Sequence, residues 1–268
     1  MHQKNLKNLV FLNFVFYALV ILFNIFAYVG FLNNIEFQGI INKYPTLITP
    51  INFTFSIWIP IYILLLLTLV YLYKNQYNSY KKTLIKPISI LFIISSLFNI
   101  AWIISFIFER FWIALLMIAG LLTMLMFILD EIYKKRSALN FFSLAVFTIY
   151  ASWILMLTII TATIFAAQQN WGGLGGIPIP IWTIVVILST TGFAVFYMFY
   201  YKNALFSFGI IWTFVGIYLS YSAGKIKTDM GSSIKFTIFT AIIILIISMI
   251  YIFQKNKKSI LPKKHYRV

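Results

Sequence analysis

Eight long apolar stretches dominate this sequence of 268 residues. A helix needs about 20 apolar residues to cross a bilayer, and each stretch is close to that length. They are residues 9–32, 53–73, 87–108, 111–130, 139–167, 180–201, 204–222 and 234–253. Charged residues make up only 10% of the chain, against about 25% in a soluble domain. The sequence therefore predicts an all-α integral membrane protein with eight transmembrane helices. It excludes a soluble enzyme and a nucleic-acid-binding domain.

The basic residues are divided unequally between the two sides that eight helices define. If the N-terminus is cytoplasmic, 16 of the 21 Lys and Arg residues fall on the inner side and five on the outer side. An excess of Lys and Arg in cytoplasmic loops is the usual pattern in membrane proteins. We therefore expect a multi-pass protein of the cell membrane with both termini cytoplasmic. The bias toward Ile, Phe, Asn, Lys and Tyr suits a bacterial source.

The predicted spans contain few of the groups that carry out chemistry. The chain has no Cys, and its two histidines, His2 and His265, lie in the terminal tails. The five carboxylates lie at or beyond the ends of the spans; they are Glu36, Glu109, Asp130, Glu131 and Asp229. We therefore predict no catalytic residue, no metal site and no proton relay of acidic and histidine side chains. Enzymatic activity is left open, with no group to assign to it.

Three of the predicted helices each carry aromatic and polar residues on one face. Trp58 and Tyr62 are four residues apart in the second helix, and residues three, four or seven apart share a helix face. We predict a ligand-binding pocket between the second, third and fifth helices, lined by Trp58, Tyr62, Asn99, Trp102, Phe106, Tyr150, Trp153 and Thr161. The alternative is helix packing, with Asn99 as an interhelical hydrogen-bonding group.

The order of these residues resembles a known family. Thr49-Pro50 precedes the second helix, and Trp58 with Tyr62, Asn99 with Trp102, and Tyr150 with Trp153 follow in three helices. This order resembles the TspO/translocator-protein family, also called tryptophan-rich sensory proteins. The resemblance covers roughly residues 1–167, which implies a five-helix core. Residues 168–268 would then add three helices and a basic cytoplasmic tail, as in longer bacterial relatives.

The resemblance implies a membrane-embedded sensor, regulator or carrier that binds a hydrophobic, tetrapyrrole-like ligand such as a porphyrin or haem. It implies that the loop of residues 33–52 covers the pocket as a lid, through Pro45, Thr49 and Pro50. It also implies a homodimer. The spans contain no His or Cys to ligate iron, so we expect metal-free porphyrin to bind about as well as haem.

Two other functions fit the residues. The first is an uncoupled transporter or permease for an uncharged or amphipathic small molecule, because spans without charges argue against proton or sodium coupling. The second is a lipid-handling or assembly factor whose aromatic interior is only packing.

Overall fold

The computed structural model describes residues 2–78, 81–134, 141–173 and 175–262. The described residues form helices and no strand, and eight of the helices are long and apolar enough to cross a membrane, as predicted. The elements are α1 (His2–Tyr28), α2 (Phe37–Lys43), the 3₁₀ helix η1 (Asn52–Ile57), α3 (Trp58–Asn75), α4 (Lys82–Ile107), α5 (Phe111–Lys134), α6 (Phe141–Gln168), α7 (Ile179–Tyr201), the 3₁₀ helix η2 (Ala204–Ser207), α8 (Phe208–Ser222) and α9 (Gly231–Lys255).

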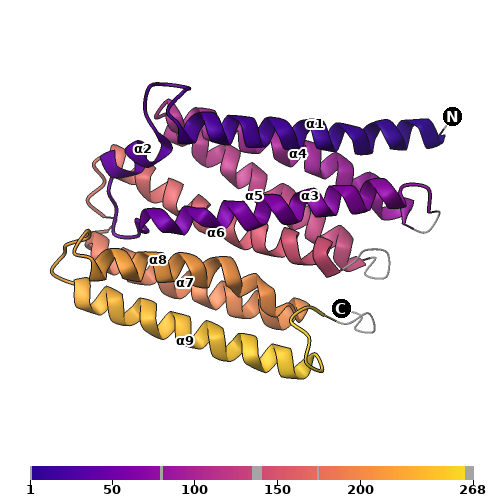
Figure 1. The fold of residues 1–268 in the computed structure, drawn as a ribbon. Helices are drawn as coiled ribbons and strands as arrows, with labels where there is room; N and C mark the ends of the chain where they lie inside the picture. Colours follow the sequence, from indigo (N-terminus) through magenta and orange to yellow (C-terminus); the bar gives the residue numbers. More distant parts are fainter. Residues whose placement is uncertain (1, 79–80, 135–140, 174, 263–268) are drawn as a thin grey trace.

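The long helices run side by side in one bundle (Figure 1). The first residue of α1 and the last residue of α9 lie at one end of the bundle, which we call the terminal end, and α2 lies at the other, the α2 end. Helices α1, α3, α4, α5 and α6 form one part of the bundle. Helices α7, α8 and α9 form the other part, and α8 packs against α6.

The helix boundaries differ most from the predicted spans near the α2 end. The first helix ends at Tyr28 instead of residue 32, because the chain turns at Gly30, whose φ of 74° is readily adopted only by glycine. The segment of residues 33–52, expected to be a loop, contains α2. Helix α2 has only seven residues, so the length criterion for membrane spans could not detect it. The span predicted to begin at residue 53 opens with the 3₁₀ helix η1, and α3 follows it from Trp58.

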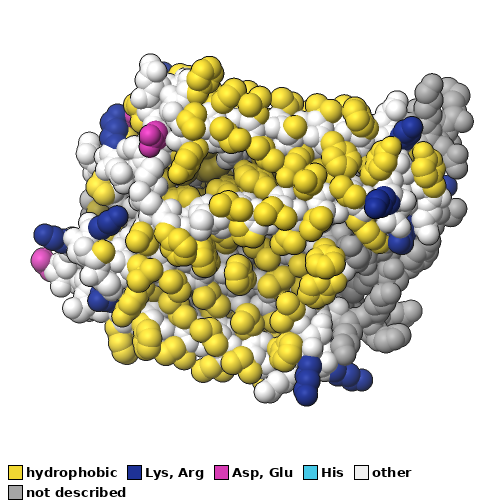
Figure 2. Space-filling view, in the orientation of Figure 1, with side chains coloured by type: hydrophobic (Ala, Val, Ile, Leu, Met, Phe, Trp, Pro, Cys, Tyr) yellow, Lys and Arg dark blue, Asp and Glu magenta, His cyan; other side chains and the backbone are white. Residues whose placement is uncertain are grey.

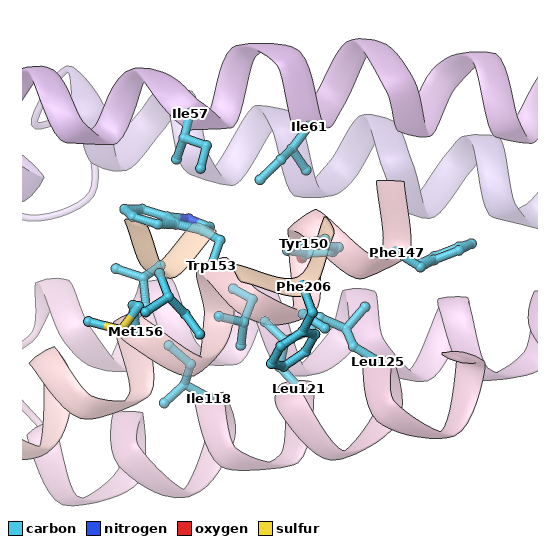
Figure 3. Packing of buried hydrophobic residues seen from close by; sticks show 14 of the residues in the cluster. Ile57, Ile61, Ile118, Leu121, Leu125, Phe147, Tyr150, Trp153, Met156 and Phe206 are labelled. Carbon is cyan, nitrogen blue, oxygen red and sulfur yellow. The ribbon is translucent and has the colours of Figure 1, made fainter. Parts of the chain in front are cut away.

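Helix α6 is the central element of the fold. In its most apolar window 78% of the residues are buried, against 17% for α1 and 22% for α9. Figure 3 shows its side chains Tyr150 and Trp153 between Ile57 and Ile61 on one side and Leu121 on the other. Helix α6 is thus packed against its neighbours over most of its surface, and a sequence that is apolar around the helix suits this position.

The surface has the distribution that a bilayer requires. Figure 2 shows hydrophobic side chains over the middle of the bundle and Lys and Arg side chains at its two ends. Large apolar side chains such as Phe11, Ile63 and Phe236 are exposed, which is stable only in lipid. Several basic residues that the charge count places on the inner side lie outside the described residues; they are Lys135, Arg136, Lys263, Lys264 and Arg267.

Candidate ligand-binding site

A pocket of about 690 Å³ lies between α1, α3 and α4 toward the α2 end. Figure 2 shows it as a hollow in the apolar surface, at the place where α1 and α3 run side by side in Figure 1. Its aromatic lining residues are Tyr28, Phe37, Phe53, Phe55, Trp58, Tyr62 and Trp102, and its polar ones are Asn24, Asn52 and Ser56. The remaining lining residues are Ile and Ala, so the described lining carries no charge.

The ring pair of Trp58 and Tyr62 forms the α3 wall of this pocket. The two rings are stacked with their centroids 5.2 Å apart and their planes 14° apart, as their spacing of one helical turn allows. Tyr17 of α1 donates from its hydroxyl to the Tyr62 carbonyl oxygen at 2.9 Å. Trp58 also makes edge contacts with Tyr150 and Trp153 of α6. Trp58 therefore separates the pocket from the packed interior.

A chain of side-chain hydrogen bonds lies at the pocket wall. Asn24 Nδ2 donates to Asn99 Oδ1 at 2.9 Å, and Asn99 Nδ2 donates to the Tyr150 hydroxyl at 3.1 Å. The chain joins α1, α4 and α6. Asn99 is fully buried and does not line the pocket. It thus has the interhelical hydrogen-bonding role that the packing interpretation predicts.

Three of the eight residues predicted to bind ligand line the pocket, namely Trp58, Tyr62 and Trp102. The other five are buried in the bundle away from the pocket lining; they are Asn99, Phe106, Tyr150, Trp153 and Thr161. Figure 3 shows the α6 members Tyr150 and Trp153 packed under α3. The space that the structure leaves open is thus bordered by α1, whereas the sequence analysis expected α6.

Two hydrogen-bond donors in the pocket lining have no partner. The hydroxyl of Tyr62 and the indole Nε1 of Trp102 are both buried without a hydrogen bond. Trp102 is only 1% exposed. A buried donor without a partner costs free energy, and an acceptor atom on a bound molecule would remove that cost. The residues that line the pocket therefore include two buried donors without a protein partner, set in a largely apolar surface.

The pocket is covered at the α2 end by Phe37 of α2. The Phe37 ring lies 6.0 Å from that of Trp102, 4.9 Å from that of Phe106 and 5.4 Å from that of Phe55. The predicted lid residues Pro45, Thr49 and Pro50 do not line the pocket. Within residues 33–52, the pocket is bordered by Phe37 of α2 and by Asn52, the first residue of η1.

An ion pair anchors α2 to the turn between α4 and α5. Lys43 Nζ lies 2.6 Å from Glu109 Oε1, and the Tyr44 hydroxyl donates to Glu109 Oε2 at 2.5 Å. Partial burial raises the pKa of the Glu109 carboxyl, but the hydrogen bonds from Lys43 and Tyr44 outweigh it, so the pKa is lowered overall. Glu109 is therefore ionised at neutral pH and holds α2 in place.

Helix α8 anchors η1, which forms part of the pocket lining. Ile51 donates from its backbone nitrogen to the Gly216 carbonyl oxygen at 3.1 Å, and Trp212 Nε1 donates to the Thr54 carbonyl oxygen at 2.7 Å. A Cβ atom on Gly216 would lie only 1.9 Å from Thr54 Oγ1. Only glycine at position 216 permits this approach, so α8 helps to position the η1 residues that line the pocket.

The pocket residues of α1, α2 and η1 were not predicted from the sequence. Asn24 could have been found, because an amide inside an apolar span seeks a hydrogen-bond partner. Phe37, Asn52, Phe55 and Ser56 lie in a loop or at the edge of a span, and nothing in their spacing distinguishes them.

The fold and site define a polytopic helical membrane protein with an uncharged aromatic pocket. A family model described as TSPO-like protein matches residues 10–251. The chain therefore belongs to the TSPO-like protein family. The match runs through α7, α8 and most of α9, beyond the five spans that carried the resemblance. No curated protein and no solved structure matches the chain.

Proposed function

We propose that the chain is a membrane-embedded binding protein, acting as a sensor, regulator or carrier, for a flat hydrophobic ligand of the tetrapyrrole class. The observation that carries the proposal is the aromatic pocket between α1, α3 and α4. Its volume of about 690 Å³ is within the usual range of about 300–1,000 Å³ for small-molecule sites. Each ring that stacks on a flat ligand contributes about 0.5–1.5 kcal/mol beyond the area it buries.

The position of the opening supports a ligand that dissolves in lipid. The pocket opens between α1 and α3, where exposed apolar side chains such as Ile25 and Ile59 form its edge. A ligand in the bilayer can reach this opening without crossing water. A highly charged molecule would lose its hydration there and would gain no ion pair from the described lining.

The donor set favours binding of a porphyrin by shape and not by its metal. The described lining contains no His, Cys or Met to ligate haem iron in the usual way. The Tyr62 hydroxyl and the Trp102 indole can instead donate to acceptor atoms of the macrocycle or its substituents. We therefore propose that metal-free porphyrin and haem bind with similar affinity.

For the topology, we propose that the terminal end of the bundle is cytoplasmic, because the inner side then carries 16 of the 21 Lys and Arg residues. The pocket would then lie in the outer half of the membrane.

The test is a titration of the purified protein in detergent with metal-free protoporphyrin, followed by tryptophan fluorescence and repeated with haem. We expect saturable binding in both titrations, weakened by Trp102→Phe in the pocket and unchanged by Trp112→Phe on the lipid-facing surface. No saturable binding by folded protein would remove the tetrapyrrole proposal. A ligand-dependent flux in proteoliposomes would replace the sensor with the transporter.

A further inference from the structure

A second pocket, of about 490 Å³, lies at the α2 end between the first five spanning helices and the last three. Four segments form it: residues 45–48, the C-terminal part of α6 with Trp171, the start of α7, and residues 225–228 between α8 and α9. It shares no lining residue with the aromatic pocket. The two pockets are therefore separate sites.

Hydrogen bonds hold one wall of this second pocket in place. The Tyr221 hydroxyl of α8 donates to the Leu47 carbonyl oxygen at 2.9 Å, and Thr163 Oγ1 of α6 donates to Thr46 Oγ1 at 3.4 Å. Residues 45–48 are thus joined to α6 and to α8. A ligand would find this wall already ordered, which lowers the entropic cost of binding.

The lining of this pocket carries positive charge. Lys225 and Lys227 both line it, and no described lining residue is acidic. In the described part of the chain, the ion pairs are made by Lys43 and Lys134 and not by these two lysines. The first turn of α7, which contributes Ile179 and Pro180 to the lining, carries no acidic residue, so the positive end of its helix dipole adds to the field.

The rest of the pocket is mainly apolar. Leu47, Ile48, Ala166, Ala167 and Ile179 line it, and Ile48 is only 3% exposed. A small inorganic anion would leave this apolar surface empty, whereas a neutral hydrocarbon would leave the lysines without a counter-charge. We propose that the pocket binds an anionic amphiphile, with its carboxylate or phosphate headgroup at Lys225 and Lys227 and its apolar chain against the apolar wall. A phospholipid of the surrounding leaflet and a free fatty acid share this chemistry.

The test compares three probes on the full-length protein in detergent: oleate, dioleoyl phosphatidylglycerol and the neutral oleyl alcohol. Native mass spectrometry counts the bound molecules, and titration gives the affinities. We expect saturable binding of at least one anionic probe. The double variant Lys225→Gln/Lys227→Gln should weaken it about five- to tenfold, because it removes two exposed charge interactions. The anion that binds more tightly identifies the source of the ligand.

The matched control is Arg110→Gln/Lys235→Gln, which removes two positive charges from the same end of the bundle without touching either pocket. Its affinity for the anions should stay within about twofold of the wild type. Equal losses in the two double variants, or equal affinity for oleate and oleyl alcohol, would overturn the proposal. The variant Tyr62→Phe should leave amphiphile binding unchanged, so this proposal and the tetrapyrrole proposal can fail separately.

Discussion

Asn24 Nδ2 donates a hydrogen bond to Asn99 Oδ1 at 2.9 Å, although the two residues are 75 positions apart. Asn24 lines the aromatic pocket, and Asn99 lies behind the wall, where it also bonds to Tyr150. Because Asn99 is fully buried, water does not compete for these bonds. The pair thus ties α1 to α4 beside the pocket.

Replacing Asn99 with leucine should destabilise the protein. The change removes the bond between α1 and α4 and leaves the Tyr150 hydroxyl without the donor that it has in the wild type. We expect a loss of about 1–2 kcal/mol, measured by thermal unfolding in detergent. The variant Tyr150→Phe removes one bond only and should cost less. An Asn99→Leu variant as stable as the wild type would show that the hydrogen-bond chain has no structural role.

The substitution Tyr62→Phe should separate stability from ligand binding. It removes a buried hydroxyl that has no partner, so the free protein should become more stable by up to about 1 kcal/mol. If that hydroxyl donates to the ligand, affinity for metal-free protoporphyrin should fall about fivefold.

The matched control for Tyr62→Phe is Tyr17→Phe. The Tyr17 hydroxyl donates to the Tyr62 carbonyl oxygen and does not line the pocket. Its loss should lower stability by about 1 kcal/mol and leave affinity nearly unchanged. We expect Tyr62→Phe to raise the stability and Tyr17→Phe to lower it. Equal changes in stability and in affinity for the two variants would contradict the proposal that the Tyr62 hydroxyl donates to the ligand.

The substitution Gly216→Ala should displace η1 from α8. The added methyl group would overlap Thr54 Oγ1, at 1.9 Å, and would force the two elements apart. We expect a destabilisation of about 2 kcal/mol or more and weaker porphyrin binding. Gly192→Ala in α7 is the control, because a Cβ atom there meets nothing within 4 Å. That change should be neutral or slightly stabilising, since alanine favours helix more than glycine does.

The contact of α2 with Glu109 should depend on pH. Because the pKa of Glu109 is lowered in the folded protein, its ion pair stabilises the fold above the ordinary carboxyl pKa. That contribution is lost as the pH falls through the lowered value. Hydrogen exchange in residues 37–44, corrected for its intrinsic rate, should therefore speed up between about pH 7 and about pH 3.5.

The variant Glu109→Gln tests this assignment. It should show fast exchange in residues 37–44 at both pH values, because it has no carboxylate for Lys43 to pair with. If the wild type and the variant respond equally to pH, another group holds α2.

The spanning helices could be predicted because lipid imposes their length and composition. The i, i+4 pair of Trp58 and Tyr62 could also be predicted, because helix geometry alone places both residues on one face. The helices that border the pocket could not be predicted. Periodicity shows which residues of a helix share a face, but it does not show which neighbouring helix that face meets. Trp153 thus carries the expected pattern, yet it is fully buried and away from the pocket.

The two short elements beside the pocket, α2 and η1, could not be predicted for a different reason. Helix α2 has only seven residues, and η1 is held by contacts with α8, far along the chain. The hydrogen bond from the Trp212 indole to the Thr54 carbonyl oxygen spans 158 positions and leaves no local signal in the sequence. Pro45 and Pro50 indicated a loop, but they did not indicate which part of the loop borders the pocket.

The bond from Trp212 to Thr54 has a consequence for biogenesis. The ribosome completes η1 long before it makes α8, and the first five spans can enter the membrane while Trp212 and Gly216 have not yet been synthesised. During that interval η1 lacks the helix that anchors it. The nascent protein therefore lacks this anchor of η1 until its seventh span has been inserted, and a chain interrupted before that point would carry the residues that line the pocket without the helix that holds η1.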